Sequence, residues 1–172
     1  MYRALVVVDY QTDFVTGSLG SIYAEHIEGN VVSKIKEYIE RGDKIFFTMD
    51  THGSNYLETD EGRHIPVKHC IRGTSGWNIH GEVAKYASKE KVIEKGTFGC
   101  TELIDLMNGF DEIEICGVAT NICVIANAIL LKTAYPDTKI TIDPKCVASY
   151  DTELHRKALD IMRSLSIDIT EE

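Results

Sequence analysis

Short apolar runs rich in β-branched residues alternate along this chain with segments of helical periodicity. The runs cover residues 4–8, 44–48, 91–94, 112–116 and 139–142, and residues 166–170 predict a last edge strand. Strands that alternate with helices form βαβ units, whose right-handed crossovers generate a parallel sheet covered on both faces. The order of elements therefore predicts an α/β fold: one three-layer α/β/α domain over residues 1–172, with a mainly parallel central sheet.

Four segments between these runs carry helical periodicity: residues 27–40, 101–107, 121–133 and 152–165. Gly42 predicts the end of the first helix, and Asp151 predicts the start of the last. The first helix is expected to bury one face, made of Ile27, Val31, Val32, Ile35, Tyr38 and Ile39.

The stretch 51–77 differs from these segments, because it is rich in glycine, histidine and turn-forming residues and lacks periodicity. A structureless loop of this length is uncommon inside a compact domain and is usually functional. In open parallel sheets, ligands bind beyond the carboxyl ends of the strands. We therefore expect the site at that edge.

The charge and the cysteines narrow the classes of function. A net charge of −9 argues against nucleic-acid binding and against attraction to anionic membranes. The N-terminus has only a few apolar residues before a charge, which predicts neither a signal peptide nor a membrane span. The five cysteines are well separated and odd in number, which predicts free thiols in a cytoplasmic protein.

Reactive side chains follow the apolar runs: Asp9, Asp50, Lys95 and, after a glycine turn, Cys123. Singly, each has an ordinary explanation, since an Asp caps a turn, a Lys is solvated and a Cys packs as a small hydrophobe. In a parallel sheet, however, all of them meet at one edge. A carboxylate base, an ammonium and a thiol at a helix start, where N–H groups favour the thiolate, form a set suited to covalent catalysis.

Three separated motifs contain these reactive residues: Val8-Asp9-Tyr-Gln-Thr-Asp13-Phe14, Glu94-Lys95-Gly96-Thr97-Phe98 and Gly117-Val-Ala-Thr-Asn-Ile-Cys123-Val124. Together they resemble the isochorismatase-like cysteine hydrolases, and among them most closely the nicotinamidases. The resemblance implies the isochorismatase-like hydrolase fold and a catalytic triad of Asp9, Lys95 and Cys123. It also implies a cis peptide bond between Val118 and Ala119, with the N–H groups of Ala119 and Cys123 facing a developing oxyanion.

A second group of side chains predicts a metal site. Asp50 and His52 lie just beyond the second strand, and Glu61 and His69 follow in the irregular stretch. Carboxylates with imidazoles suit Zn²⁺, Mn²⁺ or Fe²⁺, whereas solvated loop side chains are the alternative. The spacing resembles the nicotinamidase metal site, which implies one divalent transition metal, with zinc as the first choice and manganese or iron as the alternatives. His64 is a rival to Glu61, because the spacing before His69 has one extra residue.

The resemblance implies a nicotinamidase, which hydrolyses nicotinamide to nicotinate and ammonia through a cysteine thioester and serves NAD salvage. Phe14 is expected to form an apolar wall for the substrate ring. The chain departs from the family pattern at Ile65, where Trp is common, and at Asn121, where Asp is common. These departures leave open another small amide or ureide as substrate, or a non-catalytic relative. The expected partner is a small-molecule amide, and the sequence leaves open whether the chain forms a homo-oligomer.

Overall fold

Six strands pair into one parallel sheet in the computed structural model, which describes residues 1–87 and 92–170. Their order across the sheet is β3-β2-β1-β4-β5-β6. The strands are β1 (Arg3–Val8), β2 (Lys44–Asp50), β3 (Val92–Lys95), β4 (Glu112–Val118), β5 (Lys139–Ala148) and β6 (Asp168–Ile169). All six were predicted, although Lys91, the first residue of the expected third strand, lies outside the described residues. The strands β2, β3, β4 and β5 continue further toward their carboxyl ends than the apolar runs predicted. Asp50 of β2 pairs with Lys95 of β3, and Val118 of β4 pairs with Ala148 of β5.

The central strand β1 shows how the sheet separates two cores. Ala4, Val6 and Val8 belong to one buried cluster, and Leu5 and Val7 belong to the other. Alternate side chains of a strand point to opposite faces, so an unbroken apolar run is what a strand covered on both sides requires. The predicted three-layer α/β/α fold with a parallel sheet is therefore confirmed.

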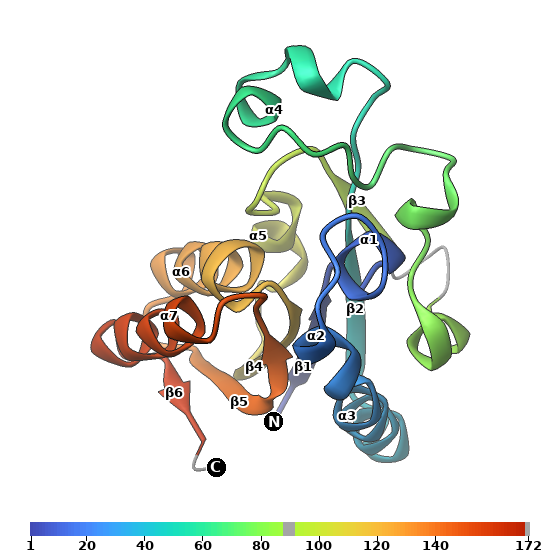
Figure 1. Cartoon of the computed structure of the whole chain (residues 1–172). Helices are drawn as coiled ribbons and strands as arrows, with labels where there is room; N and C mark the ends of the chain where they lie inside the picture. The colour runs from blue at the N-terminus through green and yellow to red at the C-terminus, as the bar shows by residue number, and fades with distance from the viewer. Residues whose placement is uncertain (88–91, 171–172) are drawn as a thin grey trace.

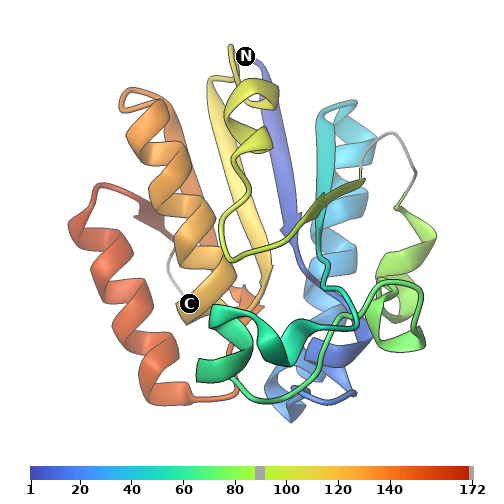
Figure 2. The same cartoon turned by 90° about the horizontal axis from the view of Figure 1, so that it is seen from above.

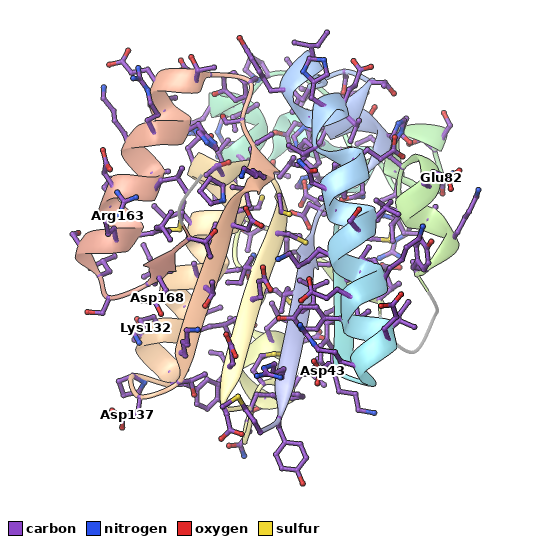
Figure 3. All side chains as sticks on the ribbon, turned by 90° about the horizontal axis from the view of Figure 1, so that it is seen from below. Asp43, Glu82, Lys132, Asp137, Arg163 and Asp168 are labelled. Carbon is purple, nitrogen blue, oxygen red and sulfur yellow. The ribbon has the colours of Figure 1, made fainter. Side chains whose placement is uncertain are left out.

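Helices cover both faces of the sheet (Figure 1). One face packs against α5 (Glu102–Leu106), α6 (Ile125–Ala134) and α7 (Thr152–Ser164), and the other against α2 (Ile22–His26) and α3 (Glu28–Arg41). The short α1 (Thr12–Val15) follows β1 directly. Exposed charged side chains such as Glu82, Asp137 and Arg163 lie at the periphery (Figure 3).

Local signals fixed the helix ends. Gly42 ends α3 with a φ of 73°, the left-handed conformation that glycine adopts readily. The Asp151 side chain caps α7 by accepting from the N–H groups of Glu153 and Leu154. The expected buried face of α3 is correct for Val31 and its neighbours, but Ile39 is 50% exposed because it lies at the edge of that face.

The stretch 51–77 is not structureless as expected. It contains a turn of 3₁₀ helix (Tyr56–Glu58), then α4 (Asp60–His64), and a second 3₁₀ turn (Ser75–Trp77). Such short helices carry no periodicity in the sequence, which explains why they were missed. The α4 segment crosses the carboxyl ends of the strands at the lower edge of Figure 2. The stretch therefore lies where the parallel sheet predicts a ligand site.

The expected helix 121–133 also differs, since its first residues form a wide π-type turn, Thr120–Val124, before α6 begins. The five cysteines are all free and buried, as predicted for free thiols. Among the described residues, every helix is too short or too polar to serve as a membrane span.

Candidate functional site

The residues Asp9, Lys95 and Cys123 come together at the carboxyl edge of the sheet. The Lys95 ammonium lies 2.6 Å from Asp9 Oδ2 and 3.6 Å from Cys123 Sγ. It also donates to the Thr97 carbonyl at 2.8 Å, and Asp9 Oδ1 accepts from the Thr48 hydroxyl at 2.7 Å. Asp9 is fully buried, and the other two are 5–6% exposed. The sheet edge thus brings the three residues of the expected triad into contact.

The Lys95 ammonium lies beside two groups that become negatively charged when they lose a proton, the Asp9 carboxyl group and the Cys123 thiol. Burial raises the pKa of Asp9, and the positive charge of Lys95 offsets only part of that rise. Burial and then the charge of Asp9 raise the pKa of Cys123 well above its usual range, against the opposing effect of Lys95. The expectation that this position favours the thiolate is therefore not met, because burial and the negative charge of Asp9 favour the neutral thiol.

The turn that carries Cys123 is fixed by backbone and side-chain contacts. A cis peptide bond joins Val118 and Ala119 just before it, as the resemblance implied. The Asn127 amide donates to the Cys123 carbonyl at 2.8 Å and to the Phe98 carbonyl at 3.3 Å. Its oxygen accepts from the backbone N–H group of residue 100 at 2.8 Å. Asn127 thus ties the cysteine turn to the loop that follows Lys95.

The four side chains expected at the metal site also converge. Asp50, His52, Glu61 and His69 each offer a ligand atom, and these atoms all lie within 4.8 Å of one another. His52 Nε2 lies 2.8 Å from Asp50 Oδ2 and 3.6 Å from Glu61 Oε1. His69 Nε2 lies 3.4 Å and 3.7 Å from the same two oxygens. Ligands at zinc-bond length in tetrahedral geometry are roughly 3.3 Å apart, so the group has the right size for such an ion.

The hydrogen bonds of the group also suit a metal. His69 Nδ1 donates to the Val67 carbonyl at 2.8 Å, which leaves Nε2 with its lone pair toward the carboxylates. Burial and the neighbouring charge of Asp50 raise the pKa of Glu61, the effect that a bound cation reverses. The rival ligand His64 lies outside the group, with its side chain 75% exposed and its Nδ1 2.9 Å from the Asp60 carbonyl. Glu61 is the residue that completes the set.

A narrow pocket of about 40 Å³ joins the two groups; we call it the catalytic pocket. It reaches Cys123 on one side and His69 of the metal-site group on the other. Its walls are mainly apolar and include Phe14 and Ile65. The Phe14 ring centroid lies 5.4 Å from that of His69, so the expected ring wall stands beside the metal-site group.

Two residues to which the sequence assigned no role, Gln11 and Asp13, hold the backbone of the metal-site group. The Gln11 amide donates to the Asp50 carbonyl at 2.9 Å and accepts from the Asp50 N–H at 2.8 Å. The Asp13 carboxylate accepts at 2.8 Å from the N–H of Cys70, which follows His69 and has a left-handed φ of 46°. The sequence did place Gln11 and Asp13 inside the first motif, which marked them as candidates. A motif, however, does not show which groups a side chain contacts.

Comparison with known families agrees with this geometry. A family model described as the isochorismatase domain matches residues 3–171. The chain belongs to the isochorismatase family. The match covers every strand of the sheet, and with it the residues of both groups at its carboxyl edge.

Relatives of this family member include proteins described as nicotinamidases. A nicotinamidase/pyrazinamidase of Mycobacterium tuberculosis is 26% identical over 184 residues, covering 97% of each chain. The crystal structure of a nicotinamidase from Bacillus subtilis matches with a TM-score of 0.85 and 29% identity, over 99% of this chain and 100% of that one. A pyrazinamidase of Pyrococcus horikoshii in complex with zinc gives a TM-score of 0.86 and 28% identity, over 100% of both chains.

Proposed function

We propose that this protein is a nicotinamidase-like amidohydrolase. The observation that carries the proposal is the contact of Asp9, Lys95 and Cys123 at the end of a pocket that also reaches the metal-site group. Family membership and the similarity to nicotinamidases and pyrazinamidases support an enzyme that hydrolyses a carboxamide. Contact among all three reactive types argues against a non-catalytic relative, since titratable groups with perturbed pKa values that gather at a pocket are typical of active sites.

The reaction starts with a proton transfer. The Cys123 thiol gives its proton to Asp9, so that the single charge of Lys95 always faces a single anion. The thiolate attacks the carboxamide carbon, and the N–H groups of Ala119 and Cys123 stabilise the oxyanion. Asp9 then protonates the departing nitrogen, ammonia leaves, and the acyl group remains on sulfur as a thioester. Asp9 next takes a proton from water, whose oxygen attacks the thioester. The C–S bond breaks and the acid is released, and Asp9 returns the proton to the Cys123 sulfur, which restores the thiol.

The metal-site group is proposed to hold one divalent transition metal through Asp50, His52, Glu61 and His69. Zinc fits this donor set, and one of the similar structures is described as a zinc complex. Such an ion, when bound, supplies a Lewis acid at the end of the pocket. Phe14 provides the apolar face against which a flat ring can stack. A flat aromatic carboxamide with a ring nitrogen, nicotinamide, suits both features.

The test is ammonia release from nicotinamide, benzamide and a panel of aliphatic amides and ureides. Because a site built around a polar contact rejects an analogue lacking it, we expect kcat/KM for nicotinamide to exceed that for benzamide by roughly a hundredfold. Cys123→Ala should abolish turnover, whereas Cys116→Ala, which removes a buried thiol elsewhere in the sheet, should retain it. Brisk hydrolysis of a ureide with no turnover of nicotinamide would contradict the proposed substrate.

A further inference from the structure

A second cavity of about 130 Å³ adjoins the catalytic pocket. The two share five walls, including Phe14, Ile65 and Ile122. Beyond these walls the second cavity, which we call the acyl chamber, extends between α2 and the end of β5, where Ala24 and Ala148 line it. Neither the proposed triad nor the metal-site group lines it. The chamber is therefore continuous with the catalytic pocket but separate from both reactive groups.

The sizes of the two spaces differ in a way that bears on the substrate. A buried water molecule needs roughly 10–15 Å³ of such volume, so the catalytic pocket of about 40 Å³ holds only a few water-sized groups. The chamber, with about 130 Å³, is the roomier of the two. Phe14, the proposed wall for the substrate ring, lines both spaces together with Ile65, whereas Cys123 lines the catalytic pocket and not the chamber. The chamber thus continues from the ring wall and away from the nucleophile.

The chemistry of the chamber walls defines what it accepts. The described residues that line it are uncharged and mostly aliphatic. The Ser21 hydroxyl is engaged, since it accepts from the N–H of Ala24 at the start of α2. The Ser149 hydroxyl donates to Asn121 at 2.5 Å and accepts from the N–H of Asp151 at 3.3 Å. Apart from these two hydroxyls and that of Tyr150, the residues lining the chamber have apolar side chains, so it presents a mainly apolar surface to an incoming group.

We propose that the acyl chamber is a subsite for an alkyl or aryl substituent on the acyl part of the substrate. This inference rests on the proposed amidohydrolase function and extends it to carboxamides larger than nicotinamide. The carboxamide lies at Cys123, the ring passes between Phe14 and Ile65, and the substituent fills the chamber. A charged substituent is disfavoured, because no charged side chain is among the described residues that line the chamber.

The experiment compares kcat/KM for nicotinamide with that for ring-ethylated nicotinamides, one for each open ring position. The chamber variant is Ala24→Leu, which adds carbon atoms to a residue that lines the chamber but not the catalytic pocket. The matched control is Ala84→Leu, at an exposed position outside both spaces. We expect wild-type protein to hydrolyse at least one ethylated substrate about as well as nicotinamide or better.

In Ala24→Leu, we expect kcat/KM for the accepted ethylated substrate, divided by kcat/KM for nicotinamide, to fall at least roughly tenfold. One methylene group in an apolar pocket changes kcat/KM by roughly 10–200-fold. An unchanged ratio, an equal fall in Ala84→Leu, or rejection of every ethylated substrate by an enzyme active on nicotinamide would overturn the inference.

A binding measurement separates failure of the chamber from failure of the proposed function. Titration calorimetry on Cys123→Ala protein compares nicotinamide with its ethylated forms without any turnover. Tighter binding of one ethylated form, lost when Ala24→Leu is added, supports the chamber even if no amide is hydrolysed. Equal or weaker binding of all ethylated forms contradicts it. If Ala24→Leu does not fold, Ala148→Leu closes the same chamber from β5.

Discussion

The ion pair between Asp9 and Lys95 makes a quantitative prediction about stability. Replacing Lys95 by Met keeps a chain of similar length and removes the charge that lies 2.6 Å from Asp9 Oδ2. Asp9 has no exposure to solvent, and the Thr48 hydroxyl and the Cys123 thiol are further hydrogen-bond partners of its carboxylate. The variant therefore leaves a buried carboxyl group whose remaining donors are neutral.

Breaking a buried ion pair by removing one partner destabilises a protein by about 3–5 kcal/mol. Here the loss depends on pH, because Asp9 escapes the unpaired charge by keeping its proton. Burial already raises the pKa of Asp9 in the native protein, and without Lys95 the pKa rises further. Each unit of that further rise corresponds to about 1.4 kcal/mol. The lost hydrogen bond from Lys95 to the Thr97 carbonyl adds about 1 kcal/mol at every pH.

The sign follows from proton linkage. In the variant, the folded state binds a proton at Asp9 that the unfolded chain releases, so its stability falls as pH rises. Below the native pKa of Asp9 both proteins are protonated there, and only the hydrogen-bond loss remains. Above it, the gap between native protein and variant grows until Asp9 ionises in the variant too.

Urea denaturation measures this gap. We expect the free energy of unfolding of Lys95→Met to lie about 1 kcal/mol below that of the native protein at the acid end and about 3–5 kcal/mol below it at the alkaline end. A chelator in every sample keeps metal binding out of the comparison. The control adds Asp9→Asn to both proteins, and the gap between Asp9→Asn and Asp9→Asn/Lys95→Met should vary much less with pH, because Asp9 no longer titrates in either. The reasoning would be refuted if the difference in the free energy of unfolding between native protein and Lys95→Met were the same at every pH. It would also be refuted if the difference varied just as strongly with pH when both proteins carry Asp9→Asn.

Two further predictions concern the metal-site group. Elemental analysis should find about one transition metal per chain. The double variant His52→Ala/His69→Ala should lose the metal and stay folded, whereas the control His64→Ala, at an exposed position, should keep it. Metal retained by the double variant would contradict the assignment. Asp13→Ala, which releases the N–H of Cys70 beside a ligand, should weaken metal binding in competition with a chelator by roughly 10–100-fold. Unchanged affinity in folded protein would mean that this hydrogen bond does not position the ligand.

The sequence by itself determined the parallel sheet and the edge at which the proposed triad lies. Runs apolar at every position, as in Val6 to Val8, suit strands covered on both faces, and helices between them require parallel pairing. Once the strands are parallel, residues that follow them must arrive at the same edge. The contact of Asp9, Lys95 and Cys123 also needs neighbouring strands, and the order β3-β2-β1-β4 was visible only in the folded chain.

Only the tertiary structure decided the finer features. The choice of Glu61 over His64 depends on how α4 folds over the strand ends, and a helix of one turn leaves no periodicity to read. The proton state of Cys123 depends on burial among distant segments, which no local pattern encodes. The acyl chamber exists because α2, the end of β5 and the α4 segment leave space between them. Packing of segments far apart in the sequence fixes such volumes and charges, so they become visible only when the chain is folded.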